Sequence, residues 1–498
     1  MELQLQKSQI PYLHTVKREL QTQEQTQEVR ISDGMPDIGN VIGTWGQVIL
    51  RSKEWESDAM RVSGGTMVWV LYNPEEGGQP QLVESWIPFQ MRWDFPPTQY
   101  DGKILAKCIL KSVDARITSA RKLMLRSNVA VLGQGMDLQL AELFTPTELP
   151  EDIQLQAAAY PMRIPVEAGE KAFTLEDTLP LPPSSPAMEQ LLYYRVLPEV
   201  TEEKIMNDKL VFRGTATLHV CYQAEDGAVH KCDFPLPFSQ YSELDREYDQ
   251  TAEADFWPCV TALETEKEDG QIRVKMGLVC QYRISHEPLI TVVEDAYSPL
   301  RSVTPQFQTL ELPGILDRKK QNIHLQTAVP AEGMRLVDVQ VLPQPVQIRT
   351  QGEERVLELP ALAQSLFYDM DGQLHANSVK WEQTMQLPAG EDASVEATLW
   401  AGGTPTGSLM SGNLQLQADL RLDTETLLGK GLSIVSALEV GDVREPDPNH
   451  PSLILRRTGE QSLWQIAKDT GSTMDAIRQA NDLQSEPTEN QWLLIPVL

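Results

Sequence analysis

The sequence predicts a mainly β protein, built from tandem antiparallel β-rich domains followed by a small βααβ domain. Three observations support this prediction. Strand-like runs such as Met67–Leu71 recur between clusters of Gly and Pro, as expected for strands that end in turns. One hairpin-like stretch occurs three times at a domain-sized spacing. The C-terminal stretch 452–498 instead has apolar residues at helical spacing, flanked by two short strand-like runs.

The repeated stretch is clearest at residues 209–238, KLVFRGTATLHVCYQAEDGAVHKCDFPLPF. It consists of a strand-like run, a Tyr, an acidic turn that ends in Gly, and a second run that ends in Pro-Phe. A first copy lies at 61–89 and a degenerate third copy at 355–387.

The marker tyrosines of the three copies, 150 and then 146 residues apart, are Tyr72, Tyr222 and Tyr368. This period is too long for a solenoid, whose repeats have about 20–50 residues, so whole domains are repeated. Pro36 and Pro186 each stand 36 residues before the marker Tyr of their copy. In the third copy the counterpart is Pro330, which precedes Tyr368 by two residues more. We expect each marker Tyr to be packed, with its hydroxyl exposed.

A chain of 498 residues has room for three or four domains of about 100–200 residues each. We therefore expect three β domains, a linker rich in Pro and Asp, and a C-terminal domain. Their predicted ranges are 1–143 (with an N-terminal lead segment), 165–295, 304–441, 442–451 and 452–498.

Within the first domain, the Gln-rich residues 1–28 predict an extended lead segment. Residues 33–42 predict a turn and then a short helix, with Pro36 at the first helical position, where its missing N–H costs nothing. From Gln47 to Leu110 the pattern predicts strands of five to eight residues, and Lys122–Leu132 predicts the last strand.

Two similar segments predict the first strands of the second and third domains. They are AFTLEDTLPL, which starts at Ala172, and QFQTLELPGI, which starts at Gln306.

The C-terminal stretch predicts a strand at LILRR, a turn and helix cap at Gly459–Ser462, and a first helix over Leu463–Asp469. A second helix follows the cap residue Thr473, and a closing strand starts at Leu493. The predicted order is therefore βααβ.

The charge excludes several classes of partner. The formal net charge is −29, from 42 Lys and Arg against 71 Asp and Glu, and such a surface repels phosphate backbones and anionic lipids. We expect no nucleic acid and no direct membrane insertion. The N-terminus lacks the pattern of a signal peptide, and no stretch reaches the ~18 apolar residues of a membrane span, so we expect a cytoplasmic protein.

Two His-x-Cys pairs, His219-x-Cys221 and His230-x-Cys232, fall on neighbouring strands of one predicted hairpin. Four such side chains could hold Zn²⁺ in tetrahedral geometry. The internal repeat, however, aligns both cysteines with apolar residues of the other copies, which favours packing of small buried thiols. We expect no metal and no other cofactor.

Signatures of catalysis are missing from the sequence. There is no G-x-x-x-x-G-K-[ST] loop, no G-x-S-x-G, no H-E-x-x-H and no C-x-x-C. Pairs of acidic residues lie in predicted hairpin turns, where such side chains are usually solvated. We expect a protein without enzymatic activity; the alternative, a wall hydrolase, would need a set of acid, base or metal-binding groups.

Residues 452–498 resemble the LysM family along their whole length. The resemblance rests on Gly-x-x-Ser-Leu from Gly459, Trp-x-Ile-Ala from Trp464, Ile-x-x-Ala-Asn-x-Leu from Ile477 and a final Leu-x-Ile-Pro. LysM domains usually bind N-acetylglucosamine polymers in a groove between the first turn and the loop after the second helix. The implied groove or adaptor patch consists of Gly459, Glu460, Gln461, Ser462, Leu463, Trp464, Ile477, Asn481, Asp482, Leu483 and Trp492.

Two features of this stretch depart from LysM domains that bind cell walls. Glu460-Gln461 stands where such members commonly carry Asp-Thr, and a wall binder should be exported although no signal peptide is recognised. Trp464 and Trp492 are expected to pack largely in the core, but so small a domain cannot bury both fully.

The repeats resemble SPOCS, the spore-coat-assembly domain of endospore-forming bacteria, over most of residues 20–290. The residues that carry this resemblance are Pro36-Asp37-Ile38, Val41-Ile42, the spans Gly64 to Tyr72 and Gly214 to Tyr222, and Arg121-Lys122.

SPOCS domains followed by one LysM domain are the arrangement of the SipL family of coat morphogenetic proteins. The resemblance implies a non-enzymatic protein of the mother-cell cytoplasm at the forespore or coat surface. It would bind the SpoIVA-type coat-scaffold ATPase through its LysM domain and other coat proteins through its β domains. The alternative is a LysM protein that binds peptidoglycan or other N-acetylglucosamine glycan in the wall or cortex.

Overall fold

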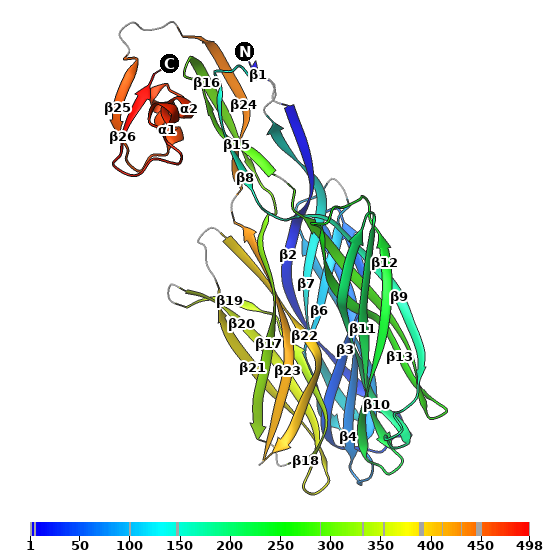
Figure 1. The fold of residues 1–498 in the computed structure, drawn as a ribbon. Helices are drawn as coiled ribbons and strands as arrows, with labels where there is room; N and C mark the ends of the chain where they lie inside the picture. Colours follow the sequence, from blue (N-terminus) through cyan, green and yellow to red (C-terminus); the bar gives the residue numbers. More distant parts are fainter. Residues whose placement is uncertain are drawn as a thin grey trace.

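The computed structural model confirms the mainly β fold class, with 75% of the structure in strands and 3% in helices. The strands pair in antiparallel sheets, and the two helices lie near the C-terminus (Figure 1). The structure describes residues 2–3, 6–98, 101–145, 149–288, 290–330, 333–351, 354–387, 393–410, 412–429, 431–444 and 451–497.

The first strand set consists of two three-stranded sheets. In chain order its strands are β2 (Gln6–Arg30), β3 (Ile38–Glu56), β4 (Ala59–Pro74), β5 (Gln81–Asp94), β6 (Lys103–Ser119) and β7 (Lys122–Thr145). The sheet orders are β2-β7-β6 and β3-β4-β5. A strand, a three-stranded meander and a hairpin therefore follow one another along the chain, and the hairpin pairs with the first strand.

The same order occurs twice more. The second strand set contains β9 (Ile164–Leu179), β10 (Met188–Met206), β11 (Lys209–Ala224), β12 (Val229–Glu243), β13 (Glu253–Glu268) and β14 (Gln271–His286). The third contains β17 (Ile315–Pro330), β18 (Gly333–Pro343), β19 (Gln347–Gln351), β20 (Glu354–Asp369), β21 (Leu374–Gln386), β22 (Ala393–Met410) and β23 (Asn413–Leu428). The sheets of the second set have the orders β9-β14-β13 and β10-β11-β12. In the third set, one sheet has the order β17-β23-β22, and in the other β18, β19 and β21 all pair with β20. The predicted hairpin at 209–238 is β11 and β12.

Short strands pair beyond these sets and form an arm. They are β1 (Glu2–Leu3), β8 (Gln154–Tyr160), β15 (Ile290–Tyr297), β16 (Arg301–Leu310) and β24 (Leu432–Val443). β8 pairs with β15, and β24 lies between β1 and β16, so the N-terminal segment contacts the arm strand that follows the third set (Figure 1). Of the predicted linker 442–451, residues 445–450 lie outside the described residues.

The prediction of strands of five to eight residues was wrong. β4 has 16 residues and β5 has 14. β4 continues through the two glycines at 64 and 65, and a Cβ on Gly64 would come within 2.2 Å of the carbonyl oxygen of Ile49. Gly64 thus allows close packing within a strand rather than ending it.

The predicted short helix at residues 33–42 was also wrong. A turn closed by the Met35 N–H and the Ser32 carbonyl leads directly into β3 at Ile38. The guanidinium of Arg121 binds the carbonyl oxygens of Ser32 and Met35 and the carboxylate of Asp37. One turn of apolar spacing cannot distinguish a helix from a strand, and tertiary contacts decided the outcome.

The segment that starts at Gln306 does not begin the third set. Its first half ends the arm strand β16, its last residue is the first of β17, and β17 occupies the position that corresponds to β9. The segment at Ala172 does lie in β9, as predicted. The two segments are therefore similar in sequence but differ in their place in the fold.

A hydrogen bond from each of two marker tyrosines to a proline explains why Tyr and Pro have the same spacing in the first two copies. The hydroxyl of Tyr72 donates to the carbonyl of Pro36 at 2.9 Å, and that of Tyr222 to Pro186 at 3.1 Å. Both side chains are fully buried, so the expected exposed hydroxyl is wrong for these two. Tyr368 differs, because its hydroxyl accepts the N–H of Val229 in the second set at 2.8 Å.

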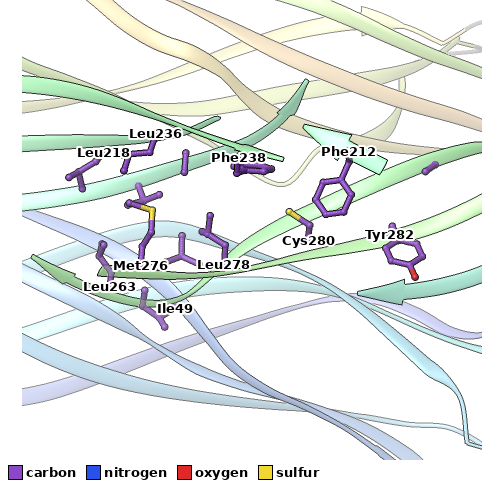
Figure 2. Close-up of a cluster of buried hydrophobic side chains, with 14 of the residues drawn as sticks. Ile49, Phe212, Leu218, Leu236, Phe238, Leu263, Met276, Leu278, Cys280 and Tyr282 are labelled. Atoms are coloured by element: carbon purple, nitrogen blue, oxygen red, sulfur yellow. The ribbon is translucent and has the colours of Figure 1, made fainter. Parts of the chain in front are cut away.

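The three sets pack against one another through buried contacts. One apolar cluster includes Ile49 of β3, Leu263 of β13 and Met276 of β14, and Figure 2 shows these side chains together. Trp45 stacks on Tyr193 with ring centroids 4.3 Å apart. Arg195 of the second set donates to Asp338 of the third at 2.7 and 3.0 Å, so the three β sets form one body rather than separate beads on a chain.

The C-terminal stretch folds in the predicted order of strand, two helices and strand. Its elements are β25 (Leu453–Arg457), α1 (Leu463–Thr470), α2 (Met474–Ala480) and β26 (Trp492–Pro496). Ser462 and Thr473 cap the two helices, as predicted, and Gly471 ends α1 with φ +65°.

Candidate functional site

The predicted site residues differ in burial, and two of them, Asn481 and Leu483, are partly buried. Leu463 and Ile477 have no exposed surface and belong to the core of the C-terminal region, and Trp464 is only 5% exposed. The first turn, Gly459–Ser462, is exposed, as are Asp482 and Trp492. Glu460 and Gln461 therefore face solvent at the predicted groove, while Leu463 and Ile477 support it from below.

The groove between the first turn and the loop after α2 is held by contacts within the chain. The carboxylate of Glu486 accepts the N–H of Leu463 at 3.0 Å, at the start of α1. The side-chain amide of Asn481 accepts the N–H of Leu494 at 2.8 Å and donates to the carbonyls of Ile477 and Leu494. Asn481 thus fixes the loop that contains Leu483 to β26. Sequence reasoning missed Glu486, because nothing local to it indicates contact with a residue 23 positions away.

Trp464 lies in a contact with the arm. Its ring packs edge-on against Tyr297 of β15, with centroids 4.8 Å apart, and its Nε1 donates to Asp295 at 2.8 Å. Lys468 donates to both oxygens of Asp295, at 2.8 and 2.7 Å. Helix α1 therefore attaches the C-terminal region to β15.

Tyr297 completes this attachment from the arm. Its hydroxyl donates to the carbonyl of Ser472 at 2.9 Å. Burial, and secondarily Asp295, raises the pKa of Tyr297 to about 12, so the phenol keeps its proton at neutral pH. Asp295 and Tyr297 were not predicted as site residues, because only the fold brings them to α1.

The two-stranded sheet β25–β26 presents an exposed apolar face, which we call the outer face. It consists of Leu453, Leu455, Trp492 and Leu494, with exposed fractions of 52%, 63%, 61% and 37%. Leu455 pairs with Leu494, and Trp492 pairs with Arg457, so these side chains share one side of the sheet. The opposite side carries the buried Leu493 and Ile495.

Trp492 was predicted as a site residue, but the three leucines of the outer face were not. The sequence did contain an indication of them. In LILRR and WLLIP, consecutive residues are apolar instead of alternating with polar ones, so both sides of the two-stranded sheet carry apolar side chains.

The alternative zinc site is not assembled. Cys221 pairs with Lys231, whereas Cys232 pairs with Val220, so the two thiols point to opposite faces of the sheet. His219 instead bonds Asp233 at 2.7 Å. No group of three or more His, Cys, Asp or Glu placed to hold a metal occurs within the part of the chain that the structure describes.

No helix among the described residues has the length and apolar character needed to cross a membrane.

One comparison with known proteins gives a match. The family model described as SipL, SPOCS domain matches residues 187–266, a span that contains β11, β12 and the marker Tyr222. Nothing among curated proteins or solved structures matches the chain. The match supports a relationship to SipL-type, sporulation-related proteins.

Proposed function

We propose that this chain is a non-enzymatic spore-coat assembly protein of the mother cell that works at the forespore or coat surface. In this proposal the C-terminal region is a LysM domain that binds a SpoIVA-type coat ATPase, and the three strand sets are SPOCS-like units that bind other coat components. Several weak attachments on one chain would raise its effective concentration at a surface coated with partners.

The SPOCS match supports the assignment of the β body. The matched span 187–266 runs through the meander β10–β12 and into β13. The same strand order occurs in the first and third sets, so we assign the SPOCS-like character to them as well.

The outer face of β25–β26 is the observation that carries the proposal of protein binding. Exposed apolar patches with a polar rim mark interaction sites, and Trp is enriched among the residues that dominate binding energy. The outer face offers no side-chain hydroxyl or amide for the hydroxyls of a sugar, and Arg457 beside Trp492 is its charged neighbour. This composition favours a protein partner over a glycan.

The position of the outer face fits the same role. Trp464 and Lys468 on α1 attach the region to the arm through Asp295. The four side chains of the outer face are not used in this attachment and stay exposed. The arm would therefore hold the outer face toward a partner.

The test is calorimetric titration of the full-length chain with recombinant SpoIVA-type ATPase and, separately, with chitin oligomers. We expect saturable binding of the ATPase and none of the glycan. Leu455→Glu should weaken ATPase binding at least about tenfold, because it places a charge in an apolar contact. Leu138→Glu on β7, where the leucine is 53% exposed, is the matched control and should bind as the wild type does. Binding of chitin alone would assign the region to glycan recognition in the groove.

A further inference from the structure

The three strand sets meet around a cavity of about 220 Å³. Corresponding strands line it: β3 and β6 from the first set, β10 and β13 from the second, and β18 and β22 from the third. Most of the wall is apolar, with Ile109, Val196, Leu342 and Leu399 among its residues. The cavity therefore lies inside the body, away from the C-terminal region.

Lys107 carries a buried amine in this wall, and burial lowers its pKa well below the usual range, because no counter-charge in the described part of the chain offsets the lost solvation of the charged form. Its side chain is 8% exposed, and its Nζ donates to the carbonyl of Leu399 at 2.5 Å and lies 3.6 Å from the ring centroid of Trp400. No carboxylate among the described residues forms an ion pair with it. Arg195, another cation of the wall, is instead neutralised by Asp338 at 2.7 and 3.0 Å.

Two further polar groups of the wall lack partners. Gln340 is 7% exposed, and its Oε1 accepts no hydrogen bond from the described residues. The indole N–H of Trp400 also has no acceptor among them. Buried polar groups are nearly always hydrogen-bonded, and the charged form of a buried amine needs a counter-charge, so these three groups together indicate a missing complementary molecule.

We propose that this cavity binds a small monocarboxylic acid with an apolar body and a hydroxyl or amino group. The carboxylate would pair with Lys107 and accept the indole N–H of Trp400, and the second group would donate to Gln340. An apolar cavity of about 150 Å³ can hold benzene, so one substituted ring or a branched acid fits the observed volume.

The lining of the cavity reaches exposed chain at the third set. Asp419 and Gly403 both line the cavity, and the side chain of Asp419 is 65% exposed. A Cβ on Gly403 would meet nothing within 4 Å, which indicates open space there. The carboxylate of Asp419 is bonded by His324 at 2.9 Å. In this proposal, a ligand would enter along this edge, without separation of the strand sets.

The test is calorimetric titration of the full-length protein with the three isomers of hydroxybenzoate, and with benzyl alcohol as a neutral probe. We expect at least one isomer to bind saturably. Lys107→Met removes the charge, keeps the chain length, and should weaken that binding about 10- to 100-fold. Lys122→Met is the matched control, because Lys122 is exposed and pairs with Glu28, and it should leave the affinity unchanged. Benzyl alcohol should bind both Lys107 forms alike.

Trp400→Phe keeps the ring under Lys107 and removes the N–H, so it tests the site even if Lys107→Met does not fold. Trp400→Phe should weaken binding of the hydroxybenzoate several-fold. The proposal is overturned if no isomer binds up to about 10 mM. It is also overturned if each variant that folds binds like the wild type, or if crystals soaked with the binding isomer hold only water in the cavity.

Discussion

Asp338 on β18 is a residue whose replacement should separate the third strand set from the second. It is 2% exposed, accepts hydrogen bonds from two residues of the second set and forms an ion pair with a third. The guanidinium of Arg195 donates at 2.7 and 3.0 Å, the hydroxyl of Tyr193 donates at 2.9 Å, and Lys231 lies 3.2 Å away.

The variant Asp338→Ala leaves Arg195 charged, 8% exposed and without its carboxylate. Removing one partner of a buried ion pair destabilises a protein by about 3–5 kcal/mol, because the remaining charge is uncompensated. We therefore expect Asp338→Ala to lower the free energy of opening of β18 and β20 by about 3–5 kcal/mol. Native-state hydrogen exchange of the amides on these strands measures that free energy.

Two controls separate this effect from a general loss of charge. Asp317→Ala removes an ion pair with Lys319 at 2.9 Å in which both side chains are about half exposed, and it should change stability by less than about 1 kcal/mol. The double replacement Asp338→Leu with Arg195→Met should recover most of the loss, since apolar residues can substitute for a buried pair. Equal exchange in Asp338→Ala and wild type would refute this account of the interface.

The pair of Asp338 and Arg195 also makes the stability of this interface depend on pH. Burial raises the pKa of Asp338, but the guanidinium of Arg195 outweighs burial and holds that pKa well below its usual range. The carboxylate thus contributes stability at pH values above its unfolded pKa of about 3.9. That contribution is lost as pH falls through the lowered pKa of the folded state, so protection of β18 should decrease in acid.

Three further predictions follow from the contacts described above. Gly214→Ala should destabilise the second strand set by at least about 2 kcal/mol, measured by urea unfolding, because its Cβ would come 2.0 Å from the carbonyl oxygen of Glu199; an unchanged midpoint would contradict the packing. Tyr222→Phe should cost about 1 kcal/mol in the same assay through loss of the bond to Pro186, and no loss would mean that this bond is not formed. Lys468→Met should increase hydrogen exchange in α1 by breaking its ion pair with Asp295 at 2.7 Å, whereas unchanged exchange would show that α1 does not depend on this pair.

The repeated hairpin shows what the sequence could predict. The alternation in β11 and β12, with a Gly turn between them, is local, and it was enough to predict strands and their repetition. The caps Ser462 and Thr473 were predictable for the same reason, because a helix start depends on the residues beside it.

Contacts between distant segments could not be predicted in this way. Arg195 and Asp338 are 143 residues apart, and Trp464 and Asp295 are 169 apart, so neither pairing leaves a local pattern. The length of the strands was not predictable from local pattern either, because β4 runs on through Gly64, whose missing Cβ allows close packing with Ile49. In the C-terminal region, Trp464 was predictable as an important residue, but its position against the arm was not.

The most direct test of the proposed function is hydroxyl-radical footprinting of the full-length chain with and without recombinant SpoIVA-type ATPase. Oxidation of Trp492, Leu455 and Leu494 should fall when the ATPase is added, while oxidation of the exposed Leu138 and Leu140 on β7 should not change. Unchanged oxidation of the outer face in a sample that contains bound ATPase would contradict the account, and it would place the contact elsewhere on the chain.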